Sequence, residues 1–412
     1  MFPNVRRTPI SWAAGNGKPG VLIEFLNSLR YEADYNKPDE SGRTPLSWAA
    51  GSGHDECVRI LLKSGGVDVN TPDNYGQTPL LWAVTFEKVG AIQLLLEHKD
   101  IDINMVDNDG KSPLALAAYN GVVQIAELLL ARGEVNPDPQ DVNGRTPLSW
   151  SAGRGHDGVV RLLLERKDVS PNLPDVGGRT PLFFAADKAH MRALELLLSH
   201  PGVDPNIPNT NGQTALLLAS KCRGNRVPVV NMLLGRNEVD PNITDNDGKT
   251  PLIWASHYGS HRVVRRLLER DDVNLGMRDN DGRTAVSWAA DRGDGRVMGM
   301  LLARKEVLPD KPDNNGRTPL SWAAQSGQGD MVGWLLGRED VNPNLQDNDG
   351  GTPLHYAAMG GWEDVVRVLL GRSDINRDLE DASGETPLSL ARKKGLAEVA
   401  QLLCLRGNYW LR

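Results

Sequence analysis

Residues 15–20 read Gly-Asn-Gly-Lys-Pro-Gly and match G-x-G-x-x-G, a pattern that holds the pyrophosphate in dinucleotide-binding proteins. That chemistry needs a β-strand before the glycines and a helix after them, so that the helix N-terminus meets the phosphates. Here the preceding residues have the pattern of a helix, and the segment falls where other copies of a repeated unit have a glycine-containing link. We therefore predict a loop and no nucleotide site.

Asp-Asn-Asp-Gly resembles the middle of a calcium-binding loop, and it begins at Asp107, Asp245, Asp279 and Asp347. Such a loop needs an acid at its first position and a glutamate at its twelfth. In the first copy these positions hold Met105 and Leu116, and the other copies also have apolar or aromatic residues there. We expect the aspartates to form turns instead, because their carboxylates can accept hydrogen bonds from nearby backbone N–H groups.

Histidines and cysteines could bind a metal ion, but their spacing does not indicate a site. His54, His156 and His190 share one position of the repeated unit and lie 34 or more residues apart, so we expect a structural role in the links. The segment 257–261 has two histidines without carboxylate or cysteine partners, and the three cysteines form no pair of metal-binding spacing. No nucleophile elbow, Walker loop or H-E-x-x-H motif is present. We predict no metal, no cofactor and no enzymatic activity.

The composition limits the classes of partner. The formal net charge is −7 over 412 residues, so the chain lacks the basic excess of a general nucleic-acid binder. No segment resembles a signal peptide, and no run of about 18 apolar residues could span a membrane. Together with cysteines that do not indicate disulfides, these features predict a cytoplasmic protein, with the nucleus as the alternative, and neither a membrane nor a nucleic acid as partner.

A Thr-Pro-Leu signature, exact or nearly so, recurs along the whole chain. The spacing is 34 residues in nine of the eleven intervals and 36 in the other two. A period of this size indicates stacked supersecondary units that bury their apolar faces against each other. The signature begins at Thr8, Thr44, Thr78, Ser112, Thr146, Thr180, Thr214, Thr250, Thr284, Thr318, Thr352 and Thr386.

Residues 141–172 show how one unit would fold. Asp-Val-Asn-Gly at 141–144 is a turn sequence, and Thr146 followed by Pro147 is an N-cap with a first-turn proline. A short first helix carries the small residues Ser151 and Ala152, which permit close approach of neighbouring helices. After a Gly-Arg-Gly-His link, a second helix has valines and leucines at helical spacing on one side and charged residues on the other.

This succession of turn, Thr-Pro-Leu helix, glycine-histidine link and leucine-rich helix resembles the ankyrin repeat, and it covers essentially all 412 residues. The resemblance implies an all-α solenoid of about twelve helix-turn-helix repeats with β-turn finger loops, and we expect residues 1–412 to form one array. Serine often replaces the histidine that usually follows Thr-Pro-Leu, tryptophan often replaces a leucine, and the unit has 34 residues rather than 33. In these respects the chain looks like the long, regular ankyrin arrays of fungal proteins, which often follow nucleotide-binding or enzymatic modules.

The two ends differ in pattern. We expect residues 386–412 to form a C-terminal cap, because Arg392, Lys393 and Lys394 replace small apolar residues. The first repeat keeps the interior pattern and lacks its finger turn, so we expect either a fragment of a longer protein or a first repeat that frays. The two longer intervals place extra residues near 30–32 and at 221–226, and such insertions often mark a binding face.

Two rows of side chains recur at fixed positions of the repeat. Seven tryptophans stand where an apolar leucine is usual, and we expect a packed ladder beneath the concave surface, with partial exposure as the alternative. The tryptophans are Trp12, Trp48, Trp82, Trp150, Trp254, Trp288 and Trp322. Eight cations precede the threonine, and we expect them to pair with aspartates of the same turns, with a row that engages an acidic or extended partner as the alternative. The cations are Arg7, Arg43, Lys111, Arg145, Arg179, Lys249, Arg283 and Arg317.

In ankyrin proteins the finger tips and the exposed end of the first helix contact the partner. Carried onto this chain, the resemblance implies that the variable residues at these positions bind the partner. They are Phe86, Tyr119, Asn120, Arg154, Lys188, Lys221, Arg223, Arg226, His257, Tyr258, Asp291, Arg292 and Met359.

The expected function is that of a scaffold that binds a protein, as a monomer unless the chain is part of a longer one. The alternatives are an enzyme or small-ligand binder with a site across repeats seven to nine, a recognition array cut from a larger signalling protein, and a structural spacer. A deep pocket near residues 221–226 would favour a ligand site, whereas a smooth groove would favour the scaffold.

Overall fold

The computed structural model describes residues 7–28, 35–221 and 226–404. Over these residues it contains 24 helices and no β-strand. The chain divides into two compact units, Met1–Thr210 and Asn211–Arg412.

Each unit consists of short helices in pairs. The helices of the first unit are α1 (Pro9–Gly15), α2 (Pro19–Ser28), α3 (Pro45–Ser52), α4 (Asp55–Lys63), α5 (Pro79–Thr85), α6 (Val89–Leu96), α7 (Pro113–Asn120), α8 (Val123–Leu130), α9 (Pro147–Arg154), α10 (Asp157–Leu164), α11 (Pro181–Lys188) and α12 (Met191–Ser199). Those of the second unit are α13 (Ala215–Ser220), α14 (Val227–Leu234), α15 (Pro251–His257), α16 (His261–Leu268), α17 (Ala285–Arg292), α18 (Gly295–Leu302), α19 (Pro319–Gln325), α20 (Gly329–Leu336), α21 (Pro353–Gly360), α22 (Glu363–Leu370), α23 (Pro387–Lys393) and α24 (Ala397–Cys404).

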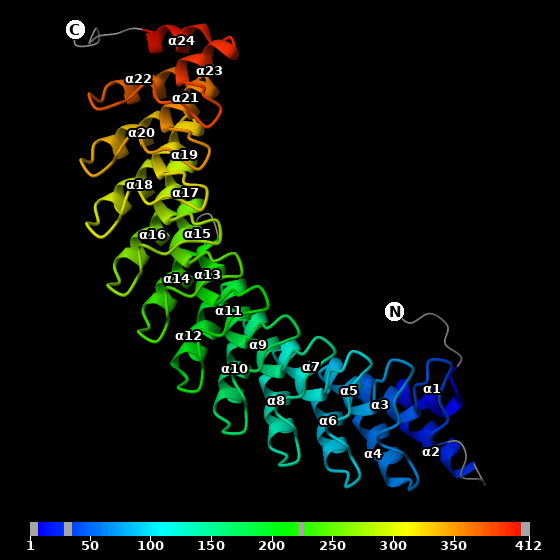
Figure 1. Cartoon of the computed structure of the whole chain (residues 1–412). Helices are drawn as coiled ribbons and strands as arrows, with labels where there is room; N and C mark the ends of the chain where they lie inside the picture. Colours follow the sequence, from blue (N-terminus) through cyan, green and yellow to red (C-terminus); the bar gives the residue numbers. More distant parts are fainter. Residues whose placement is uncertain (1–6, 29–34, 222–225, 405–412) are drawn as a thin grey trace. The chain divides into compact units, whose positions relative to one another are not determined.

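The helices of each unit form two layers (Figure 1). Odd-numbered helices, the first helices of the repeats, pack on one another, and even-numbered second helices do the same beside them. The sequence period predicts this all-α repeat architecture, and the structure confirms it.

The signature residues explain where the first helices begin. In α9 the Thr146 hydroxyl accepts the backbone N–H of Ser149 at 3.1 Å, and Pro147 fills the first helical position. The helix ends at Gly155, whose φ of 73° is left-handed. The third repeat has no glycine in this link, and Glu87 adopts the left-handed conformation there with a φ of 58°.

The finger turns are joined from repeat to repeat by single backbone hydrogen bonds. In the first unit the Val142 N–H donates to the Asp109 carbonyl at 2.9 Å, and in the second the Asn280 N–H donates to the Asp247 carbonyl at 2.9 Å. These bonds, together with the Asp279 N–H donating to the Arg283 carbonyl at 3.0 Å within one finger, satisfy backbone groups without a sheet.

The interior lies between the two layers. The second helices contribute residues such as Val159, Leu163, Val263 and Leu267, which are almost fully buried. At the end of each second helix an arginine often reaches back to the preceding repeat, as where Arg166 donates to the Leu130 carbonyl at 2.8 Å. Cations in this position also interact favourably with the helix dipole.

Several predictions about particular segments can be compared with this fold. Of the loop predicted at residues 15–20, residues 16–18 form the link between α1 and α2, whereas Gly15 belongs to α1 and Pro19 and Gly20 belong to α2, so the prediction is confirmed in part. Residues 392–394 are exposed at the end of the last described repeat. The insertion near residues 30–32, and residues 222–225 of the second insertion, lie outside the described residues.

Candidate functional site

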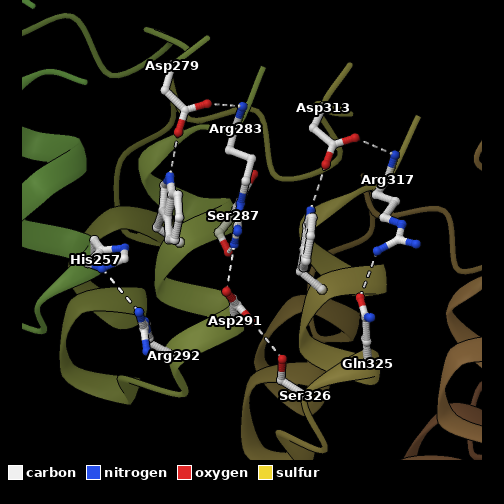
Figure 2. Close-up of polar contacts among 12 residues, drawn as sticks. His257, Asp279, Arg283, Ser287, Asp291, Arg292, Asp313, Arg317, Gln325 and Ser326 are labelled. Atoms are coloured by element: carbon white, nitrogen blue, oxygen red, sulfur yellow. Dashed lines mark hydrogen bonds and ion pairs between the residues drawn. The ribbon is translucent and has the colours of Figure 1, made fainter. Parts of the chain in front are cut away.

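In six of the described repeats the finger is attached to the first helix through an aspartate that accepts the indole N–H of a tryptophan. Asp279 is the example in Figure 2: its Oδ1 accepts the backbone N–H groups of Asp281 at 3.1 Å and Arg283 at 2.8 Å. Its Oδ2 accepts the indole N–H of Trp288 at 2.8 Å. The carboxylate therefore closes the turn and fixes the indole at the same time.

The same arrangement recurs wherever a tryptophan and an aspartate share a repeat. The indole-to-carboxylate distances in five further repeats lie between 2.7 and 3.0 Å. The pairs are Trp48 and Asp39, Trp82 and Asp73, Trp150 and Asp141, Trp254 and Asp245, and Trp322 and Asp313.

Cations lie between the aromatic rings of successive repeats and form a column with them. The Arg283 guanidinium carbon is 3.7 Å from the Trp288 ring centre and 3.9 Å from that of Trp322. In the first unit Arg43 is placed in the same way, 3.7 Å from Trp48 and 3.8 Å from Trp82. Burial lowers the pKa of Arg43 to about 10, so this side chain still carries its charge near neutral pH. Cation–π attraction is strongest for desolvated cations of this kind.

Repeats without a tryptophan show what the aspartate requires. In α11 the ring is Phe184, which has no N–H, and Arg179 instead donates to the same Asp175 oxygen at 2.6 Å. In α7 the residue is Leu116, and Gln77 of the preceding repeat donates to Asp107 Oδ2 at 2.9 Å. The buried carboxylate thus obtains a donor in each case, because an unsatisfied buried charge is costly.

These contacts correct two predictions about the rows. Pairing of the cation with its own turn is confirmed for Arg179 with Asp175 and for Lys111 with Asp109, at 3.0 Å. For Arg145 and Arg283 it is wrong: Arg145 lies over the Trp150 and Phe184 rings, and Arg283 pairs with Asp291 at 2.9 Å. In both repeats the indole N–H donates to the aspartate Oδ2, the atom that Arg179 contacts in the repeat without a tryptophan.

The tryptophan ladder is confirmed in part. Trp48, Trp82, Trp254 and Trp288 are buried, and Trp150 and Trp322 are half-buried. For Trp12 the prediction is wrong, because half of this side chain is exposed.

Next to this column lie the residues predicted to bind a partner; we call them the helix-end row. Its members in the first unit are Phe86, Tyr119, Asn120, Arg154 and Lys188, all exposed or half-buried at the C-terminal ends of first helices. Phe86 stacks on Trp82 with ring centres 5.5 Å apart, and the Arg154 guanidinium lies 3.5 Å from the Tyr119 ring centre. Phe86 thus rests on a ring that its aspartate holds in place, and Arg154 rests on Tyr119, another member of the row.

The helix-end row of the second unit comprises Lys221, Arg226, His257, Tyr258, Asp291, Arg292 and Met359, again exposed or half-buried. Arg223 lies outside the described residues. Lys221 forms an ion pair with Asp245 at 3.2 Å and lies 4.0 Å from the Trp254 ring centre, and Tyr258 stacks on that same ring.

Asp291 connects two neighbouring repeats of this row (Figure 2). It accepts hydrogen bonds from Arg283 at 2.9 Å and from the Ser326 hydroxyl at 2.6 Å. In the next repeat Arg317 donates to Gln325 at 2.9 Å. The sequence did not single out Ser326 or Gln325, because their partners are known only from the structure: Ser326 donates to Asp291 of the preceding repeat, and Gln325 accepts from Arg317 of its own repeat.

His257 is the most strongly perturbed group of the row. Its Nε2 accepts a hydrogen bond from Arg292 at 3.1 Å, and its ring lies 4.3 Å from that of Trp288. Nδ1 is buried and makes no hydrogen bond with the described residues. Burial, followed by the charges of Arg292, Lys249 and Arg283, lowers the pKa of His257 to about 4, so the ring is neutral near pH 7.

Two of the three link histidines, His54 and His156, have the structural role expected from the sequence. His54 Nε2 lies 3.2 Å from the Gly15 carbonyl, and His156 Nε2 lies 3.1 Å from that of Tyr119. In the last but one repeat Trp362 occupies this position and donates to the Gln325 carbonyl at 3.0 Å. Over the described residues, no group of three or more His, Cys, Asp or Glu side chains is placed to hold a metal ion.

Helix pairs stacked through a repeated frame define a helical repeat protein. A family model for ankyrin repeats (3 copies) matches nine overlapping segments, residues 10–107, 65–141, 99–175, 129–209, 167–245, 188–277, 216–308, 272–346 and 320–411. The chain belongs to the ankyrin repeat family. Ankyrin repeats are in general protein-interaction modules.

A search among curated proteins finds no match to the chain. Within the described part of the chain, no helix has the length and apolar character needed to cross a bilayer.

Proposed function

We propose that the chain is a scaffold that binds another protein through the helix-end row and the adjoining fingers. The observation that carries this proposal is that each first helix has buried residues that recur between repeats and an accessible residue at its end that varies. Its frame residues, such as Ala185 and Ala186 in α11, are buried, whereas the variable residue at its end, Lys188, is exposed. Side chains that differ between repeats are thus available for contact without disturbing the packing.

The column beneath the row supports the same function. Because rings such as Trp82 and Trp254 are fixed by hydrogen bonds and cations, the side chains stacked on them lose little further conformational freedom on binding. Preorganisation of this kind improves affinity by lowering the entropic cost of association. The setting that we propose is the cytoplasm or the nucleus, where the free thiols of Cys57 and Cys404 would remain reduced.

Affinity capture from extract of the native cells tests the proposal. The full chain and a variant with Arg154→Ala and Arg292→Ala are immobilised, and captured proteins are quantified by mass spectrometry. The matched control is Arg161→Ala with Lys305→Ala, which removes two exposed cations outside the row. We expect a specific partner to be lost with the row variant and kept with the control. Equal capture by all three proteins would contradict the proposal.

A further inference from the structure

Three hollows in the second unit share residues and form one continuous furrow. They have volumes of about 560, 550 and 540 Å³. His261 and Asp294 line both the first and the second, and Arg262 and Val227 line both the first and the third. The furrow follows the second helices α14, α16, α18 and α20, which lie next to one another within this unit (Figure 1).

Four exposed arginines line the furrow: Arg262, Arg265, Arg296 and Arg292, of which Arg292 also belongs to the helix-end row. None of them forms an ion pair with a residue that the structure describes. Arg262 and Arg296 occupy the same position in the neighbouring helices α16 and α18, so their cations follow one another along the furrow. This row is distinct from the cations of the column, which are covered by aromatic rings.

Comparison with equivalent positions shows that α16 is unusual. Arg59 and Arg367 stand where Arg265 does, and they pair within their own helices with Glu56 at 3.4 Å and Glu363 at 3.7 Å. In α16 the positions three and four residues before Arg265 hold Arg262 and His261. Like charges at this spacing destabilise a helix. An anion bound between Arg262 and Arg265 would remove that repulsion.

The acidic residues near the furrow either have a partner within the chain or lie at the end of the furrow. Glu269 pairs with Arg266 at 2.6 Å, and Asp294 caps α18 by accepting the Val297 N–H at 3.0 Å. In α20 the position equivalent to Arg296 holds the exposed Asp330, which ends the row of cations. The furrow therefore has a net positive charge over three repeats, although the whole chain is acidic.

An aromatic surface lies at the same end. Trp334 lines the hollow with Arg296, and 49% of its side chain is exposed. Its ring lies against Gly299 of α18, where an added Cβ would overlap the indole. The absence of a side chain at residue 299 thus lets a flat apolar surface adjoin the arginines.

We propose that this furrow binds an acidic segment of a partner protein in extended conformation. Carboxylates of the segment pair with Arg262, Arg265 and Arg296, and an apolar side chain packs on Trp334. This inference rests on the proposed function, protein binding, and names the chemistry of the partner. A peptide with spaced carboxylates fits better than a nucleic acid, because Asp294 and Asp330 interrupt and end the cations and would repel a continuous phosphate backbone.

Fluorescence anisotropy with the full chain tests the inference. The probe is a labelled peptide of about twelve residues, roughly 40 Å when extended, rich in glutamate and ending in phenylalanine. We expect binding that weakens as salt is added. Arg262→Glu with Arg296→Glu should weaken peptide binding by at least about tenfold. Trp334→Ala should weaken binding of this peptide but not of a second peptide that lacks the phenylalanine. Arg161→Glu is the control, because Arg161 occupies the position of Arg265 in a repeat of the first unit and is also exposed.

Each other result overturns the inference. No binding of the glutamate peptide, or equal loss with Arg161→Glu, would exclude a specific furrow site, and tighter binding of an oligothymidylate of similar length would indicate a nucleic-acid surface instead. Thermal unfolding of every variant, followed by circular dichroism, shows that a lost signal is not lost folding. If the peptide fails while the helix-end variant still loses its captured partner, only this inference fails. If the peptide binds while that capture is unaffected, the helix-end row is wrong and the furrow stands.

Discussion

At the scale of single residues, the finger aspartate has more partners than any sequence pattern indicates. The sequence predicts its role in the turn, because Asp-x-x-Gly is a local signal. It does not predict the indole bond, which joins Asp279 to Trp288 across a turn and a helix start. It does predict that Arg179 pairs with Asp175, but not that Arg283 pairs with Asp291 instead of with the aspartate of its own turn.

We expect Asp279→Ala to lower the free energy of unfolding by about 3 kcal/mol, because two backbone donors and one buried indole N–H lose their acceptor. Chemical denaturation followed by circular dichroism measures the change. Asp281→Ala is the control, since this exposed neighbour in the same turn should change stability by less than about 0.5 kcal/mol. Equal effects of the two substitutions would show that the aspartate network contributes nothing.

His257 gives the second prediction at this scale. Its pKa is about 4 in the folded chain against an ordinary value of 6.5, so below about pH 6.5 the unfolded chain binds a proton that the folded chain does not. The contribution of His257 therefore lowers stability as pH falls from about 6.5 to 4, and it has no effect above that window. NMR titration of the imidazole should give the low pKa.

The variant Arg292→Ala separates the causes of this low pKa. Removing the neighbouring charge should raise the pKa of His257 part of the way toward 6.5, while the remaining burial keeps it below that value. An unchanged titration in this variant would mean that Arg292 does not act on the ring.

At the scale of elements, the helices follow directly from local signals. Threonine caps, first-turn prolines and left-handed glycines mark both ends of the first helices, and the leucine pattern marks the second helices. The contacts between second helices could not be predicted in the same way. From the sequence, Gly299 is expected only to destabilise α18. The structure shows that Trp334 of α20, the neighbouring second helix, occupies the space beside it.

We expect Gly299→Ala to be neutral or destabilising although alanine favours a helix, because its Cβ would displace the Trp334 indole. In a Trp334→Ala background the same substitution should stabilise the protein by about 0.5 to 1 kcal/mol. Gly333→Ala is the matched control one repeat further on, where the nearest atom is Val368 Cγ1 at 4.0 Å, and it should stabilise in either background. A double-mutant cycle by chemical denaturation measures the coupling, and additive effects would contradict the contact.

At the scale of the whole molecule, the period predicts the number and type of repeats because every copy carries the same signals. It does not predict the division into two compact units, Met1–Thr210 and Asn211–Arg412. Within each unit a repeat packs on its immediate neighbours, and the stability of such an array is close to a sum of repeat and nearest-neighbour terms.

A destabilising substitution should therefore affect mainly its own repeat and the adjacent ones. We expect Leu163→Ala, which empties a fully buried position of α10, to cost about 2 to 5 kcal/mol and to raise hydrogen exchange in its own and adjacent repeats. Leu301→Ala removes the equivalent buried side chain of α18 and should give the same pattern centred there. Hydrogen-exchange mass spectrometry distinguishes these maps, and a uniform loss of protection throughout the chain would contradict nearest-neighbour behaviour.

The column of cations and rings also has a consequence for how such a chain can change in length. Arg283 contacts one ring of its own repeat and one of the next, so both neighbouring repeats contribute to this junction. Duplication or deletion of one 34-residue block, in register, would again place the cation of one repeat next to the ring of the following repeat. Insertion or deletion of a few residues would leave the cation without that second ring. Unequal recombination between copies that carry both the cation and the ring is thus a route by which the array could gain or lose repeats while these junctions stay complete.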